Sequence, residues 1–263
     1  MTIARYGPWA LIIGGSEGVG ASFARKLAAQ KFNLVLVARK AEPLAQVAND
    51  VRAMGVETRT ASVDLSKSDA LAQVRIATDD VEVGFLIYIA GANKIRGNFV
   101  ELDPQAYRDV IAITVIGQAE FVRHYGALMQ ARGRGGIILA GSSSNFLGSA
   151  TLATYTGAKA FSRIFTESLW AECRPMGIDV LHIVINFTDT PAMHRAGVDT
   201  SAAQSPDEVA QQSLDNMNNG PLLILGGQKG LDMAMRRSGL INRAELIQTI
   251  ATPRREDIKN VRT

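Results

Sequence analysis

The chain has 263 residues, of which 47% are hydrophobic and 20% charged, with a net charge of +3, one cysteine and three histidines. The single cysteine excludes an intrachain disulfide and a cysteine metal cluster, and no apolar run approaches the length of a membrane span. The histidines lack metal-ligand spacing, so we expect no metal site. The length of the chain predicts one domain over residues 1–263, and the single cysteine suits a cytoplasmic setting.

Apolar, strand-like runs alternate with helical patterns along the chain. They predict strands at 9–14, 33–38, 57–63, 85–90, 136–141, 178–185 and 221–226, and helices at 18–30, 41–54, 67–77, 104–130, 152–174 and 206–218. Most of the strands are continuously apolar and β-branched, which is typical of strands buried on both faces. Repeated βα units of this kind predict an α/β fold: a single Rossmann-type, doubly wound sheet of about seven parallel strands with helices on both faces.

A glycine-rich turn, GGSEGVG, joins the first expected strand to the first expected helix. Gly14, Gly18 and Gly20 have the spacing G-x3-G-x-G. Glycine lets the backbone turn sharply and approach a pyrophosphate, and the following helix directs its free N–H groups at that anion. The position of the turn therefore predicts a dinucleotide site, to which we also assign Ser16 and Val19.

The second expected strand ends at Ala38 and Arg39, where an NAD-binding fold usually places an acidic residue that bonds the ribose 2′-hydroxyl. An arginine can bind a 2′-phosphate instead, so we predict NADP(H) in preference to NAD(H). An ordinary surface arginine is the alternative, and Glu17 in the glycine turn counts against a nearby phosphate. Asp64, at the end of the third strand, is placed to bond an adenine amino group or to cap a helix beginning near Ser66.

Tyr155 and Lys159 lie four residues apart in the stretch TYTGAKAF, at the beginning of a predicted helix. At this spacing they share one helix face, and a nearby ammonium lowers the pKa of a phenol and makes it usable for proton transfer. Ser142 ends the preceding strand, thirteen residues before Tyr155, which leaves room for a loop that brings the two hydroxyls together. Most such Tyr/Lys pairs are incidental, but the dinucleotide turn in the same chain favours catalysis.

Together these motifs resemble the classical short-chain dehydrogenases/reductases over about residues 7–226. The opening segment is most similar to the hydroxysteroid dehydrogenase and 3-oxoacyl reductase branches of that family. The residues that carry the resemblance are Gly14, Gly18, Gly20, Asp64, Leu65, Ala90, Gly91, Ser142, Tyr155 and Lys159.

The resemblance implies an enzyme that transfers a hydride between a nicotinamide and a secondary alcohol or ketone. Tyr155 is then expected to transfer the proton, Lys159 to bind the nicotinamide ribose and tune Tyr155, and Ser142 to orient the substrate oxygen. Thr188 and Thr190 have the spacing expected for holding the carboxamide.

Three places depart from the pattern of this family. Ile89 replaces a second asparagine, Thr114 replaces the helix asparagine of a water-linked proton relay, and Ile185–Asn186 replace a Pro-Gly pair. A threonine hydroxyl can donate and accept a hydrogen bond with less reach than an amide, so we keep Thr114 in the catalytic set and expect slower turnover. The alternative is a non-catalytic, dinucleotide-binding regulator with the same fold.

Three segments, 93–99, 143–149 and 187–203, are predicted to line a substrate pocket. Their apolar side chains are Ile95, Phe99, Phe146, Leu147, Met193 and Val198. They favour a bulky apolar substrate, steroid-like or fatty-acyl, unless they are packing residues. Within 187–203, which we expect to form a lid, His194 and Arg195 face either an acidic substrate group or solvent.

The long apolar helices at 104–130 and 152–174 correspond to those that pair subunits in the family, so we expect a homodimer or homotetramer. Residues 227–263 are expected to be a variable C-terminal extension. Residues 221–263 hold eight basic residues against four acidic ones, and a basic tail can bind nucleic acid. Because no aromatic residues are interleaved with these charges, we favour a solvated end and no nucleic-acid partner.

Overall fold

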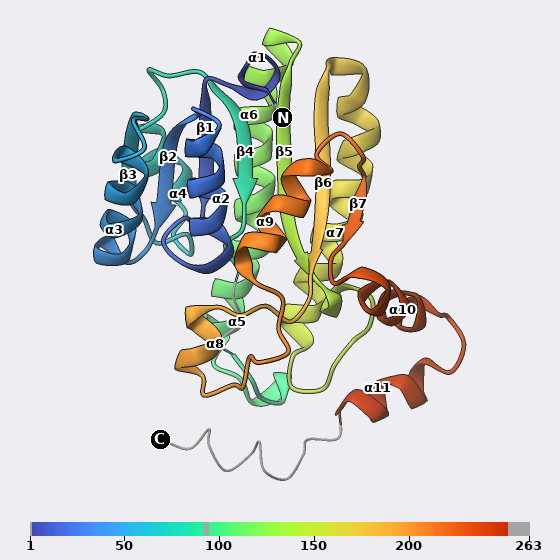
Figure 1. The fold of residues 1–263 in the computed structure, drawn as a ribbon. Helices are drawn as coiled ribbons and strands as arrows, with labels where there is room; N and C mark the ends of the chain where they lie inside the picture. Colours follow the sequence, from blue (N-terminus) through green and yellow to red (C-terminus); the bar gives the residue numbers. More distant parts are fainter. Residues whose placement is uncertain (1, 92–94, 252–263) are drawn as a thin grey trace.

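The computed structural model describes residues 2–91 and 95–251, with the backbone alone for 249–251. A single parallel sheet of seven strands lies at its centre, in the order β3-β2-β1-β4-β5-β6-β7 (Figure 1). The strands are β1 (Trp9–Ile13), β2 (Asn33–Ala38), β3 (Thr58–Ser62), β4 (Val83–Tyr88), β5 (Gly135–Ser142), β6 (Ile178–Ile185) and β7 (Leu222–Ile224). The predicted doubly wound, Rossmann-type sheet is confirmed.

Helices cover both faces of this sheet (Figure 1). One face packs against α2 (Gly18–Ala29), α3 (Ala41–Arg52) and α9 (Pro206–Asp215), and the other against α4 (Ala70–Arg75), α6 (Gly117–Arg132) and α7 (Ala153–Cys173). Successive residues of β1 divide between the two cores: Ala10 and Ile12 join the first, whereas Leu11 and Ile13 join the second, and all four are fully buried. A strand covered on both faces needs a continuous apolar run, which explains the sequence pattern.

The predicted helix over 104–130 is interrupted. It consists of α5 (Pro104–Ile111) and α6, joined by the π-helical turn η2 (Ala112–Ile116), which contains Thr114. A π-helical turn inserts an extra residue into a helix and often lies at a functional site. The periodicity of the sequence does not reveal this turn, because the apolar pattern continues through it.

Further short elements were not predicted. They are α1 (Ile3–Tyr6), η1 (Phe99–Glu101), η3 (Ser143–Asn145), η4 (Arg174–Met176), α8 (Pro191–Arg195), α10 (Gly227–Ser238) and α11 (Arg243–Ala251). The last two occupy much of the segment expected to be a variable extension. The basic residues beyond position 251, on which the nucleic-acid alternative depends, lie outside the described residues, as do positions 93 and 94 of one expected pocket wall.

The order of the strands fixes where a ligand can bind. The chain leaves β1 toward β2 and β3 and then returns to the other side of β1 as β4. The connections that follow β1 and β4 therefore diverge at the carboxyl end of the sheet, which is where open α/β sheets bind ligands. The glycine turn and Ala90–Gly91 follow these two strands, whose last residues, Ile13 and Tyr88, are paired in register. In the described part of the chain, no helix is long and apolar enough to cross a membrane.

Candidate active site

The glycine turn brings its own backbone into close contact. Gly14 has a φ of 100° and Gly18 a φ of 53°, a left-handed conformation that disfavours other residues. A Cβ on Gly20 would overlap the carbonyl oxygen of Gly14, so α2 begins directly against the turn. The side chain of Val19 is buried in the core beneath, and Ser16 lines the cleft above. The backbone is thus left open toward the carboxyl end of the sheet.

A cleft of about 430 Å³ runs along this end of the sheet. Eight of the predicted site residues line it: Gly14, Ser16, Arg39, Asp64, Leu65, Ala90, Gly91 and Thr114. Further lining residues that the sequence did not predict include Lys40, Ala106, Asp109 and Val110. The dipeptide Arg39–Lys40 was the available signal for Lys40, which adds a second cation at the end of β2.

Asp64 has a local role that differs from the predicted helix cap. Its Oδ1 accepts hydrogen bonds from the backbone N (3.0 Å) and the Oγ (2.9 Å) of Ser66, and α4 begins only at Ala70. The carboxylate therefore closes a turn rather than capping a helix. These bonds lower the pKa of Asp64, against the opposing effect of burial, with a smaller contribution from Arg39. An ionised acceptor thus faces the cleft beside the Arg39 guanidinium.

Gly91 lines the cleft and lies beside two of the catalytic candidates. Its φ is 129°, and a Cβ there would lie 3.1 Å from Thr114 Oγ1 and 3.3 Å from Lys159 Nζ. The structure therefore brings the predicted relay position and the predicted catalytic lysine to the same point, although they lie on η2 and α7. Both side chains are buried. The absence of a side chain at position 91 is what leaves room for this arrangement.

Ser142 and Tyr155 are brought together as expected from their spacing. Ser142 lies near enough to Tyr155 for its hydroxyl to affect the pKa of the phenol, and Ser142 Oγ accepts a hydrogen bond from the backbone N of Ser144 at 3.2 Å. Burial raises the pKa of Tyr155, and Ser142 opposes this rise. The sequence analysis expected the ammonium of Lys159 to lower this pKa. This pKa is raised instead, because burial has the largest effect and Lys159 is not among the groups that shift it.

The Lys159 ammonium is directed at the backbone of β5. Its Nζ donates a hydrogen bond to the carbonyl oxygen of Ala140 at 3.0 Å and lies 5.8 Å from the centre of the Tyr155 ring. Burial lowers the pKa of Lys159 to about 8. Most lysine side chains in the population are therefore still charged at pH 7, next to a phenol that keeps its proton.

The segment 187–203 reaches across to the glycine turn. Arg195 forms a bidentate ion pair with Glu17, with bonds of 2.6 and 2.8 Å. A Cβ on Gly18 would lie 3.1 Å from Thr190 Cγ2, and the Thr190 hydroxyl accepts a hydrogen bond from Met193 N as the N-cap of α8. The charge of Glu17, which counted against a nearby phosphate, is therefore balanced by a cation from a segment far away in sequence.

The other threonine of this segment, Thr188, is buried. Its hydroxyl donates a hydrogen bond to Asn186 O at 3.1 Å. His194 contacts Asp189 at 2.5 Å and so forms an ion pair when protonated. Neither His194 nor Arg195 is thus merely solvated.

The departures from the family pattern have structural explanations. The side chain of Ile89 packs against the core beneath α2. Asn186 Nδ2 donates to the carbonyl oxygen of Leu225 and contacts Gly226 and Gly230 at the start of α10. The asparagine that replaces glycine therefore ties the end of β6 to the C-terminal helices.

Two of the expected pocket-lining residues are packed instead. Phe146 and Leu147 are buried, and Phe146 lies in a small core with Val184 and Ala234 of α10. Phe99, Met193 and Val198 are exposed, with 49%, 38% and 40% of their surfaces accessible, and Ile95 lines the cleft.

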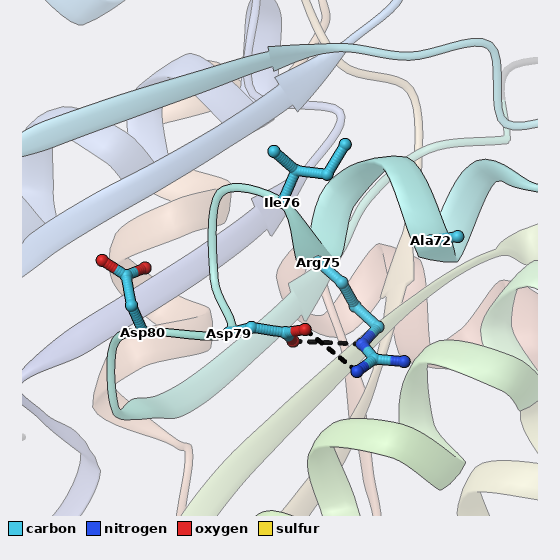
Figure 2. A pocket seen from close by; sticks show the side chains of 5 residues that line it. All are labelled: Ala72, Arg75, Ile76, Asp79 and Asp80. Carbon is cyan, nitrogen blue, oxygen red and sulfur yellow. Dashed lines mark hydrogen bonds and ion pairs between the residues drawn. The ribbon is translucent and has the colours of Figure 1, made fainter.

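A hollow on α4 lies apart from these groups. Figure 2 shows Arg75 directed at Asp79, with bonds of 2.9 and 3.0 Å, and Asp80 turned away from them. Asp80 pairs with Arg59 at 2.5 Å. Because its charges are paired with one another and no catalytic arrangement is present, this hollow is not a candidate site. In the described part of the chain, no three His, Cys, Asp or Glu residues are grouped so that they could hold a metal ion.

A doubly wound parallel sheet of this order is typical of dinucleotide-binding proteins. The family model for short chain dehydrogenases matches residues 8–200, and the chain belongs to this family of NAD(P)-dependent oxidoreductases.

Two curated relatives place the chain more closely. It is 29% identical over 236 residues to the 7beta-hydroxysteroid dehydrogenase of Collinsella aerofaciens, a match that covers 87% of this chain and 89% of the relative. It is 30% identical over 213 residues to the very-long-chain 3-oxoacyl-CoA reductase of Neurospora crassa, which covers 79% of this chain but 64% of that longer protein. Both branches named by the sequence resemblance are therefore among its relatives.

Two solved structures resemble this chain in fold. A structure described for its insights into 7beta-hydroxysteroid dehydrogenase stereoselectivity superimposes with a TM-score of 0.89 at 28% identity, covering 95% of this chain and 99% of the other. A short-chain dehydrogenase from Sphingobium yanoikuyae in complex with NADPH superimposes with a TM-score of 0.77, also at 28% identity, covering 87% and 94%.

Proposed function

We propose that the chain is an NADP(H)-dependent reductase of bulky apolar ketones that works through Ser142, Tyr155 and Lys159. One observation carries the proposal: Ser142 lies near enough to Tyr155 to shift the pKa of its phenol, and the buried Lys159 ammonium lies 5.8 Å from the centre of the Tyr155 ring and beside Gly91, which lines the cleft. A phenol with a raised pKa is protonated at neutral pH. This is the form that donates a proton to a carbonyl oxygen.

The residues at the cleft suit a nicotinamide dinucleotide. The glycine turn and the N-terminus of α2 favour a pyrophosphate, and a side chain at Gly14 would collide with the backbone of Ala90. The remaining residues that we assign to cofactor binding are Ser16, Gly18, Val19, Gly20, Asp64, Leu65, Ala90, Tyr155, Lys159, Thr188 and Thr190. Two cations at the end of β2, Arg39 and Lys40, support NADP(H), because they can neutralise a 2′-phosphate.

Each catalytic side chain has a defined task in this proposal. When bound, the dinucleotide supplies the hydride. The Ser142 hydroxyl orients the substrate carbonyl oxygen, and Tyr155 gives that oxygen its proton as negative charge develops there. The Lys159 ammonium stabilises the phenolate that remains. Thr114, beside Lys159 at Gly91, offers a hydroxyl through which the proton on Tyr155 can be restored.

For the substrate, we propose a steroid-like ketone rather than a fatty-acyl ketone. The hydroxysteroid relative matches over 89% of its length, whereas the match to the 3-oxoacyl relative spans 64% of that protein. The exposed apolar side chains of Phe99, Met193 and Val198, in two of the segments expected to line the substrate pocket, offer a surface for such a body. The segment 187–203 then acts as a lid, and the described residues 227–251 form an extension of the same domain.

The assembly is part of the proposal. Exposed apolar residues on α5 to α7, with accessible fractions of 39% for Ile111, 50% for Ile116 and 51% for Ile164, favour a homodimer or homotetramer formed through these helices. The single cysteine, Cys173, is buried and unpaired, which suits a cytoplasmic setting.

The test begins with fluorescence titrations of the purified chain with NADPH and with NADH. Turnover is then measured with NADPH on a ring-ketone steroid and on a long-chain 3-oxoacyl thioester. We expect tighter binding of NADPH and faster reduction of the steroid. Binding of either cofactor without turnover of any ketone would favour the non-catalytic regulator, and equal binding of the two cofactors would remove the role of Arg39.

A further inference from the structure

A fully buried histidine lies directly behind the proposed catalytic groups. His182, in the middle of β6, has no exposed surface, and a Cβ on Gly141 would overlap its Nε2. Gly141 immediately precedes Ser142. The imidazole therefore packs on the backbone of β5 at the residue before the catalytic serine, and only glycine at position 141 leaves room for it.

The hydrogen bonds of this ring assign its tautomer. Thr166 Oγ1 donates its one proton to Ser162 O at 2.6 Å, so it meets His182 Nδ1, at 3.2 Å, as an acceptor. Nδ1 therefore carries the ring proton. Nε2 then accepts from Asn145 Nδ2 at 3.1 Å. Burial lowers the pKa of His182 to about 3, with further lowering from Lys159 and Arg163, so the ring is neutral across the physiological range.

Asn145 connects the ring to the catalytic serine. It ends η3, the single turn that begins directly after Ser142, and its side chain is buried. The start of the same turn is held by the bond from Ser144 N to Ser142 Oγ. One end of the turn is thus bound to the serine hydroxyl and the other to the histidine, so movement of Asn145 changes where Ser142 lies relative to Tyr155.

The opposite side of the ring connects to the catalytic lysine. Lys159, Ser162 and Thr166 occupy positions i, i+3 and i+7 of α7, which places all three on one helix face, and all three are buried. Lys159 bonds Ala140 O, two residues before Ser142. Lys159 therefore joins α7 to β5, the strand that carries Ser142, and the Thr166–His182–Asn145 chain joins α7 to β6 and to the turn that follows Ser142.

We infer that His182, acting through Asn145 and Thr166, is a positioning residue that fixes the Ser142 hydroxyl against Tyr155. This inference rests on the proposed function for its kinetic consequence. Its geometric content, a neutral ring protonated at Nδ1 and hydrogen-bonded at both nitrogens, does not depend on the proposed function. A neutral ring also avoids placing a third positive charge near Lys159 and Arg163.

The geometric content is tested by nitrogen NMR of the chain labelled with ¹⁵N-histidine, which is tractable because there are three histidines. We expect a His182 signal pattern with the proton on Nδ1, unchanged from pH 5 to pH 8, and altered by Thr166→Val. A ring that titrates in this range, or that carries its proton on Nε2, would overturn the inference. This measurement needs no substrate, so it tests the protonation and hydrogen bonds of His182 even if no ketone is reduced and the proposed function fails.

The kinetic content is tested with Asn145→Ala and with the pair His182→Leu and His182→Gln. Loss of alignment by about 1 Å costs on the order of 100-fold in rate, so we expect kcat to fall about 10- to 100-fold in Asn145→Ala and His182→Leu. KM and the Kd for NADPH should stay within about twofold. His182→Gln keeps an acceptor for Asn145 Nδ2 and should recover most of kcat.

Two measurements separate positioning from a loss of stability. In alcohol oxidation, the acid-side inflection of kcat should move to higher pH in Asn145→Ala, because Ser142 lowers the pKa of Tyr155. Thr78→Val is the control: its buried hydroxyl bonds Tyr125 and Val74 O, away from the site, and kcat should not change. An unmoved inflection, or an equal loss of kcat in the control, would contradict positioning.

Discussion

Lys159 Nζ lies 3.0 Å from the carbonyl oxygen of Ala140, so a buried ammonium joins α7 to β5 two residues before Ser142. Its charge has a cost, because burial lowers the pKa of this lysine to about 8 from 10.5. The shift corresponds to about 3 kcal/mol of unfavourable free energy while the group is charged. The folded chain therefore keeps a cation near Tyr155 at a cost in stability.

The pH dependence of stability follows from this shift. Between about pH 8 and pH 10.5 the unfolded chain keeps the Lys159 proton that the folded chain releases, so stability should rise with pH across this window. Relative to Lys159→Met, the wild-type free energy of unfolding should increase by roughly 2–3 kcal/mol from pH 7 to pH 10. Urea denaturation of both chains measures this. Taking the difference removes the opposite effect of the buried tyrosines, and a constant difference would contradict a depressed lysine pKa.

Arg39 should decide between the two dinucleotides. A charge-assisted hydrogen bond to a 2′-phosphate is worth roughly 1.5–3 kcal/mol, so Arg39→Ala should weaken NADPH binding about 10- to 150-fold and leave NADH nearly unchanged. Fluorescence titration provides both constants. Arg25→Ala is the matched control, since Arg25 pairs with Asp50 on the surface between α2 and α3. Equal weakening of NADPH and NADH would mean that Arg39 acts on the fold and not on the phosphate.

The ion pair between Arg195 and Glu17 should matter for binding more than for stability. Arg195 is 51% exposed and Glu17 34%, and exposed pairs contribute about 0–1 kcal/mol. Arg195→Ala removes a cation from the glycine turn and should weaken NADPH binding about fivefold, whereas Glu17→Gln should not weaken it. Both variants should unfold at nearly the wild-type urea concentration. Stronger loss of affinity in Glu17→Gln would show that the carboxylate itself supports the cofactor.

The C-terminal helices should stabilise the turn after Ser142. Arg237 Nη1 donates to Ser143 O at 3.1 Å and Arg243 Nη2 donates to Phe146 O at 3.2 Å. Arg237→Ala should therefore cost about 1 kcal/mol, since one charge-assisted bond at a half-buried site is lost. Arg236→Ala, at the exposed neighbouring position, should cost less than half as much. Equal costs in urea denaturation would show that the helix, rather than the bond, responds.

The fold was accessible from sequence because its local signals agree. Continuous apolar runs predicted buried parallel strands, and the glycines after β1 marked the beginning of α2 to the residue. Groups that approach through short, regular connections, such as Ser142 and Tyr155, were also within reach. The π-helical turn at Thr114 was not, because a single inserted residue leaves the apolar pattern intact.

Long-range pairs could not be foreseen. Glu17 and Arg195 are 178 residues apart, and Asn145 and His182 are 37 apart, so their contacts depend on how loops and strands meet in three dimensions. The predicted effect of Lys159 on Tyr155 failed for a related reason. The helix spacing was right, but the depth of burial, which governs the pKa of the phenol, is a property of the whole fold.

The most direct test of the proposed mechanism is the turnover of Tyr155→Phe with NADPH and a ring-ketone steroid, measured beside its Kd for NADPH. Phenylalanine keeps the ring and removes only the phenolic hydroxyl, which is the proposed proton donor. We predict that NADPH affinity stays within about threefold of wild type and that kcat falls about 100- to 10,000-fold, the usual contribution of a positioned general acid. Retention of wild-type kcat in this variant would contradict the assignment of Tyr155 as the proton donor.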